Sequence, residues 1–304
     1  MKTTETCWKG EAALELETDG LRLVAPTEFG PRILYFGDES NGNWLLEIPT
    51  DPAAPADQFQ LRGGHRLWHA PEDPVRTYQP DNDPVERDAL PGGGFLLRQA
   101  VEPATGMAKE ISVSPAGKRT VRIDHRLANR GLWTVTCAPW ALTVLRPGGT
   151  AVMPFPARGE HPRDLLPGHR LVPWSYADFS LPCWKFHRTW LGLTTECATP
   201  QKIGQGGHPG WLAYVRGGAA FVKASRPRPR SLYPDLGCQA ELFTDGLMLE
   251  LETLGPLVDL APGDVSTHRE YWTLFEKVPD EEIIGEADGL RERIETWAAE
   301  LVWN

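Results

Sequence analysis

The stretch LMLELETLGPLVDLAPGDVSTHREYWTL, residues 247–274, decides the fold class. Its first seven residues alternate, so an extended strand would carry leucines on one face and Met248, Glu250 and Glu252 on the other. The turn residues Pro262 and Gly263 follow, and residues 266–274 form a second alternating run rich in aromatic side chains. Alternating runs joined by Pro- and Gly-containing connections predict strands of an antiparallel sheet.

The same pattern extends outward over most of the chain. Residues 12–18 and 121–127 alternate apolar and polar side chains, and residues 133–145 form a β-branched and aromatic run. The chain has 304 residues with 30 Gly and 28 Pro, and a proline at about every eleventh position leaves few uninterrupted helical windows.

Only the tail shows helical spacing. Its acidic start at residues 279–282 suits the positive end of a helix dipole, and apolar residues recur at helical spacing up to Leu301. We therefore predict an all-β protein, a large antiparallel β-sandwich in one domain spanning residues 1–304. A C-terminal α-helix at about 280–301 should pack on its outside.

Charge and composition exclude several classes of partner. The net charge of −10 disfavours nucleic acid, and no stretch approaches the roughly 18 apolar residues that a membrane helix needs. Five cysteines without a CxxC pair fit reduced thiols better than a disulfide framework. The N-terminal residues lack an apolar signal region, so we expect a cytoplasmic protein without bound metal or cofactor.

Two carboxylates on one strand face form the first candidate site. Glu250 and Glu252 would lie about 7 Å apart on an extended strand. In the next strand His268 shares a face with Glu270 and Trp272. One interpretation is a solvated outer face. The other is a sugar site, because carboxylates move protons and bind hydroxyl groups while aromatic rings pack on a sugar ring.

The second candidate site is the segment GGHRLWHAPE, residues 63–72. In an extended strand His65 and His69 would share one face, and Arg66 and Trp68 the other. A metal site is weakly supported, because the flanking Gly and Pro residues disfavour a helix and no third ligand is obvious. A structural strand with Trp68 in the core and a polar site at a strand end both remain open.

With these residues, the chain resembles the galactose mutarotase-like (aldose 1-epimerase) superfamily. The resemblance rests on PTEFGPRI at 26–33, RLANRG at 126–131, LET at 251–253 and LAPG at 260–263. It is strongest to a branch of the superfamily that carries GG-[HD]-R-L-W-x-A-P-E, Y-P-D and E-L-E-T-L-G-P. It implies the β-supersandwich fold, Glu252 as the catalytic base and His65 or His69 as the acid. The second histidine, which mutarotases carry shortly after the L-x-N strand end, has no counterpart after Asn129.

The expected function is acid/base interconversion of sugar anomers in a concave cleft. The same fold also serves glycosidases and lyases, in which Glu250 or Glu241 would act together with Glu252, and sugar-binding proteins without activity. The predicted binding residues, besides the catalytic Glu252, His69 and His65, are Arg32, Arg66, Trp68, Glu72, Lys185, Glu241, Glu250 and His268. The cations Arg32, Arg66, Lys185, Lys202 and Lys223 allow a carboxylated or phosphorylated sugar, although acidic partners for them are equally available.

Overall fold

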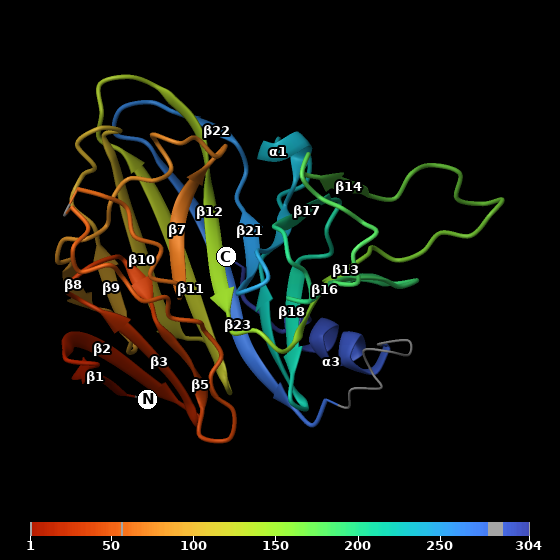
Figure 1. Cartoon of the computed structure of the whole chain (residues 1–304), viewed down its shortest axis with the longest axis horizontal. Helices are drawn as coiled ribbons and strands as arrows, with labels where there is room; N and C mark the ends of the chain where they lie inside the picture. The colour runs from red at the N-terminus through yellow and green to blue at the C-terminus, as the bar shows by residue number, and fades with distance from the viewer. Residues whose placement is uncertain (1, 56, 279–287, 304) are drawn as a thin grey trace.

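Antiparallel strands in three sheets make up most of the regular secondary structure in the described residues (Figure 1). The structure is a computed structural model that describes residues 2–55, 57–278 and 288–303. All strand pairings in this part of the chain are antiparallel, as the sequence predicts. No helix in the described residues is long and apolar enough to cross a membrane.

An eight-stranded sheet and a ten-stranded sheet form the two main layers, and a five-stranded sheet is built from the N-terminal strands. The eight-stranded sheet has the order β14 (Arg170–Pro173), β17 (Gln201–Gly206), β20 (Ala240–Thr244), β21 (Leu249–Leu254), β12 (Val135–Leu145), β7 (His65–Ala70) and β4 (Arg32–Ile33), with β22 (Val258–Leu260) paired to β12. The ten-stranded sheet has the order β15 (Trp184–Phe186), β16 (Trp190–Leu193), β13 (Thr150–Pro154), β18 (Trp211–Arg216), β19 (Ala219–Ala224), β23 (Val265–Glu276), β11 (Thr120–Asn129), β10 (Met107–Pro115), β9 (Phe95–Arg98) and β8 (Glu86–Ala89). The five-stranded sheet has the order β1 (Lys2–Trp8), β2 (Glu11–Thr18), β3 (Leu21–Pro26), β5 (Tyr35–Asp38) and β6 (Gly42–Asn43).

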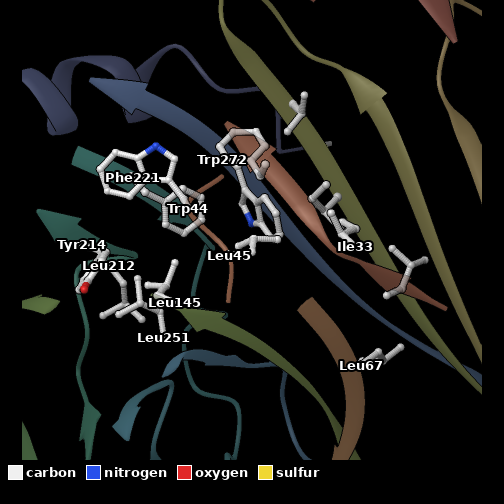
Figure 2. Packing of buried hydrophobic residues seen from close by; sticks show 14 of the residues in the cluster. Ile33, Trp44, Leu45, Leu67, Leu145, Leu212, Tyr214, Phe221, Leu251 and Trp272 are labelled. Carbon is white, nitrogen blue, oxygen red and sulfur yellow. The ribbon is translucent and has the colours of Figure 1, made fainter. Parts of the chain in front are cut away.

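The main hydrophobic core holds side chains from all three sheets. Leu145 of β12 and Leu251 of β21 belong to the same buried cluster as Phe221 of β19 and Trp272 of β23 (Figure 2). The Trp272 ring packs edge-on against Phe221 and against Phe36 of β5, with ring centroids 5.4 and 5.3 Å apart. Leu249 and Leu251 therefore lie on the core face of β21, as the alternation predicts, and the glutamates face the other way, whereas Leu247 precedes the strand and is exposed.

The predicted C-terminal helix is present as α3 (Asp288–Ala299). Leu290 and Ile294 are buried in a separate apolar cluster with Trp211 of β18 and Val222 of β19. The helix thus covers the outer face of the ten-stranded sheet, as expected. Its predicted start at residues 279–282 lies outside the described residues. The other helical element is the single turn α1 (Pro234–Gly237).

Candidate functional site

The outer face of the eight-stranded sheet carries a row of polar side chains. Strand register places Arg66 of β7 opposite Leu142 of β12, Leu142 opposite Glu252 of β21, and Glu252 opposite Glu241 of β20. Directly paired residues of neighbouring antiparallel strands point to the same face. Arg66, Glu241 and Glu252 therefore lie on one surface although they are far apart in the chain, because the strand order places their strands side by side.

A cavity of about 510 Å³ lies over this face. Its walls are mostly aromatic and apolar, and its charged groups are two cations and two carboxylates. The lining residues are Phe59, Leu61, Arg66, Trp68, Glu72, Tyr78, Trp140, Leu142, Tyr176, Lys202, Phe243, Met248 and Glu250. An aromatic pocket with a few converging polar groups is the usual form of a small-molecule site.

Lys202 of β17 is the central cation of the cavity floor. Its Nζ lies 2.8 Å from Glu252 Oε2 and 2.9 Å from Glu241 Oε2. It also lies 4.6 and 4.7 Å from the ring centroids of Trp140 and Trp174. Burial works against the charge on Lys202, but the two carboxylates outweigh it and raise the pKa of Lys202 well above its usual value.

Glu252 and Glu241 lie beneath the lining residues, and neither side chain is exposed. Glu252 Oε2 also accepts a hydrogen bond of 2.8 Å from Trp140 Nε1, whereas its Oε1 has no hydrogen-bond partner among the described residues. Burial, reinforced by the charge of Glu252, raises the pKa of Glu241 well above its usual value despite the nearby Lys202. The two carboxyl groups therefore differ in their surroundings: Glu252 Oε2 accepts from Lys202 Nζ and Trp140 Nε1, while burial favours the protonated form of Glu241.

Arg66 and Glu250 form the second charged pair of the cavity. Arg66 Nη2 donates to Glu250 Oε1 at 3.1 Å, and the guanidinium carbon lies 4.1 Å from the Trp68 ring centroid. Arg66 Nε and Nη1 have no hydrogen-bond partner within the described part of the chain. Burial raises the pKa of Glu250, although Arg66 opposes this shift.

The structure brings together six of the predicted site residues and places the others elsewhere. Arg66, Trp68, Glu72 and Glu250 line the cavity, and Glu241 and Glu252 lie at its floor. Trp140 and Tyr176 were not predicted in this site, and Lys202 was named only among five cations that a charged sugar could contact. These residues come from separate segments, and no local pattern marks any of them.

Arg32 and Lys185 lie outside the cavity. Arg32 is fully buried beside Arg66, where it bonds Asp81 Oδ2 at 2.5 Å and main-chain carbonyl groups of residues 60–63. Lys185 is exposed on β15, at the far edge of the ten-stranded sheet.

The three predicted histidines, His65, His69 and His268, are absent from the cavity lining. His65 and His69 alternate with Arg66 and Trp68 on β7 and so lie on the opposite face of the sheet. His268 bonds Thr253 Oγ1 at 2.7 Å, on the core side of β21. Burial lowers the pKa of His69 and of His268 to about 3. These histidines are therefore neutral side chains between the sheets, and the expected acid role of His65 or His69 has no geometric support.

His65 belongs to a chain of hydrogen bonds between the two main sheets. His125 Nδ1 faces the carbonyl oxygen of His268 at 3.0 Å and must donate, so its Nε2 accepts from His65 Nε2 at 2.7 Å. His65 Nδ1 then accepts from the Thr143 hydroxyl at 2.9 Å, and Thr143 accepts from Lys223 Nζ at 3.0 Å. Burial lowers the pKa of His65 and of His125, in agreement with neutral rings.

Glu270 closes this network. It pairs with Lys223 Nζ at 2.8 Å and accepts from Trp272 Nε1 at 2.8 Å and from the Thr253 hydroxyl. Potential ligand atoms of His65, His125 and Glu270 lie within 4.8 Å of one another. Those atoms already bond each other or Lys223, whose positive charge would repel a cation. The arrangement therefore suits a hydrogen-bond network that joins the sheets better than a metal centre.

Comparison with known proteins was informative only at the level of structure. No protein-family model and no curated protein sequence matches the chain. A galactose mutarotase-like protein from Lactobacillus casei matches with a TM-score of 0.58 and 8% identity, over 86% of this chain and 100% of that one. A galactose mutarotase related enzyme from Lactobacillus acidophilus matches with a TM-score of 0.54 and 8% identity, over 88% and 98% of the two chains.

A TPR-domain containing protein from Parabacteroides distasonis also matches, with a TM-score of 0.58 and 14% identity. The match covers 88% of this chain but 48% of that protein, so the chain spans about half of its length. At such identities the likeness concerns the fold alone. This protein is therefore an antiparallel β-sandwich with the galactose mutarotase-like fold.

Proposed function

We propose that the cavity binds a sugar and that the protein is an aldose 1-epimerase-like isomerase. The observation that carries this proposal is the pairing of aromatic walls with buried polar atoms that lack partners among the described residues. Arg66 Nε and Nη1 are donors, and Glu252 Oε1 is an acceptor. A hydroxyl group can accept from the first and donate to the second, while the exposed rings of Tyr78 and Tyr176 in the lining can pack on the C–H face of a pyranose.

Interconversion of anomers requires one base and one acid. The base takes the proton of the anomeric hydroxyl, a C1=O bond forms, and the C1–O5 bond breaks with its electron pair passing to O5. The acid gives a proton to O5. After rotation about C1–C2 the ring closes on the other face of the carbonyl group, and both protons return.

Glu252 is the proposed base, because its Oε2 is held by Lys202 and Trp140 while its Oε1 accepts no bond from any described residue. Lys202 is the proposed proton donor, because it lines the cavity as an ammonium group and the predicted histidines lie on the other face of the sheet. Lys202 covers Glu252. When a sugar binds, Lys202 keeps its contact with Glu241 and releases Glu252 toward the ligand.

Polarimetry tests this activity directly. Freshly dissolved pure α and β anomers of D-glucose and D-galactose should approach their equilibrium rotation faster in the presence of the protein. A rate equal to the buffer rate for every sugar, with a folded protein, would contradict the proposal. Saturable binding without acceleration would instead support a sugar-binding protein without activity.

Glycoside hydrolysis is the second candidate, and one observation favours it. Glu241 and Glu252 face each other on neighbouring strands and contact the same Lys202 Nζ at 2.9 and 2.8 Å. Carboxyl groups about 5–5.5 Å apart are typical of retaining glycosidases. Chromatography of products from a panel of oligosaccharides separates this reaction from anomer interconversion, and unsaturated uronate absorbance detects a lyase.

A further inference from the structure

The cavity contains a buried ion pair between Glu250 and Arg66. We propose that Glu250 is a specificity-determining residue that makes the cavity select sugars without an anionic group. This inference rests on the proposed function, because it concerns the ligand of the same cavity. It narrows the sequence-based expectation, which left neutral, carboxylated and phosphorylated sugars open.

The geometry of Arg66 carries the argument. A guanidinium group binds a carboxylate or phosphate best through two parallel N–H groups on one edge. Its two such edges are Nε with Nη2 and Nη1 with Nη2, and Nη2 contributes one N–H group to each. Glu250 Oε1 accepts from Nη2 at 3.1 Å and so takes a donor from one of the two edges. A second anion at Arg66 would therefore lie beside the carboxylate already paired with it, whereas a hydroxyl oxygen needs only one of the remaining donors.

Burial strengthens this effect. The Arg66 and Glu250 side chains are only 4% and 6% exposed. Charges in such a site are weakly screened, so the negative charge of Glu250 cancels most of the attraction that Arg66 would exert on a second anion.

The neighbouring cations are occupied in the same way. Lys202 contacts two carboxylates, and Arg32 is paired with Asp81. Arg66, Lys202 and Arg32 therefore each have a carboxyl group as a partner. Glu72 is a further carboxyl group in the cavity wall, and it accepts a hydrogen bond from the Tyr78 hydroxyl.

The charge balance points the same way. The lining carries two cations, Arg66 and Lys202, and two carboxyl groups, Glu72 and Glu250, and the carboxyl groups of Glu241 and Glu252 lie directly beside Lys202. The cavity therefore has no surplus of positive charge that would attract an anionic sugar, and it suits a neutral or cationic one.

Isothermal titration calorimetry with two matched series tests the inference. The ligands are D-glucose, D-glucosamine, D-glucuronate and D-glucose 6-phosphate, with the corresponding four galactose derivatives. In each series we expect the two acids to bind at least tenfold more weakly than the neutral sugar. The amino sugar should bind at least as tightly as the neutral sugar.

Two glutamine variants separate the Glu250 contact from net charge alone. Glu250→Gln keeps the shape of the side chain and a neutral hydrogen bond to Arg66, but it leaves Nη2 open to competition from an anion. It should improve the affinity for the acids relative to the neutral sugar about tenfold, the lower end of what a charge-assisted hydrogen bond contributes. Glu72→Gln removes the same charge from the same cavity but leaves Arg66 occupied, and it should change this ratio less than threefold.

Several outcomes would overturn the inference. One is a wild-type protein that binds an acid as tightly as the parent sugar, and another is an equal shift in the two variants. Tight binding of the acids alone would leave the sugar site standing and refute only the selectivity. Absence of binding by every member of both series would refute the proposed function, and the inference with it.

Discussion

Replacing Glu252 by glutamine removes the proposed base with the smallest change of shape. In the native protein, Glu252 Oε2 accepts from Trp140 Nε1 and Lys202 Nζ, both at 2.8 Å. The amide oxygen of a glutamine can accept both bonds, and loss of the Glu252 charge, which raises the pKa of Glu241, favours ionisation of Glu241 beside Lys202. We therefore expect a folded protein that loses about 1–3 kcal/mol of unfolding free energy, the usual cost of weakening a charged hydrogen bond.

The catalytic effect of Glu252→Gln should be much larger. A positioned acid or base contributes about 10²–10⁴ in rate, which corresponds to about 3–5 kcal/mol of activation free energy. Polarimetry on pure anomers measures this loss, and thermal unfolding measured in parallel shows that the fold survives.

Glu250→Gln is the matched control, because Glu250 and Glu252 share a strand face. It should reduce the rate with a neutral sugar by less than Glu252→Gln does. Equal and large losses would indicate a mechanism with two carboxylates. A folded Glu252→Gln protein with full activity would refute the assignment of the base.

Three further predictions concern stability. Burial lowers the pKa of His208 to about 3, so this ring stays neutral in the native state but gains a proton below about pH 6.5 in the unfolded state. The unfolding free energy of the protein therefore falls as the pH decreases from about 6.5 toward 3. His208→Asn keeps an acceptor for Gly210 N–H. It should reduce the slope of the unfolding free energy against pH by up to about 1.4 kcal/mol per pH unit, as measured by urea titration. An unchanged slope would contradict this prediction. Lys223→Met leaves the buried Glu270 without its counter-ion and should lower the unfolding free energy by about 3–5 kcal/mol. The double variant with Glu270→Gln should recover most of this loss. No recovery in the double variant would show that the ion pair is not the cause. Ile294→Ala removes a buried side chain of α3 and should cost about 2–4 kcal/mol in chemical denaturation, without changing sugar affinity in calorimetry.

The fold class could be predicted because many of its strands have a local pattern of alternating apolar and polar residues in the sequence. In β21 Leu249 and Leu251 face the core and the glutamates face away, so the antiparallel class and the alternation from Leu249 onward are confirmed, whereas Leu247, predicted on the same face, lies before the strand and is exposed. The helix α3 was likewise predicted from a local pattern, the helical spacing of Leu290 and Ile294. That the whole chain folds as one domain stays a prediction.

The face that each side chain occupies was harder to predict for β7. Alternation correctly separated His65 and His69 from Arg66 and Trp68, but all six residues of this strand are buried. A strand buried on both faces has no contrast between apolar and polar sides, so its sequence does not show which face lines the cavity. The histidines were therefore expected in the site, and the structure places them between the sheets.

The position of Lys202 depends on strand order, which no local pattern records. Strands β17, β20, β21, β12 and β7 are neighbours in the sheet although residues 202 and 66 are far apart in the chain. Lys202 therefore meets Glu241, Glu252 and Trp140 only after the sheet has formed. The same long-range pairing separates Lys185, on the edge of the other sheet, from the cavity.

A crystal structure of the protein with a saturating neutral aldose would test the central claim most directly. We predict a sugar ring in the cavity against Tyr78 and Tyr176, with a hydroxyl oxygen within hydrogen-bond distance of Arg66 and another hydroxyl close to Glu252 Oε1. A sugar bound at any other surface, or a cavity without sugar density at concentrations that saturate binding in solution, would contradict the account.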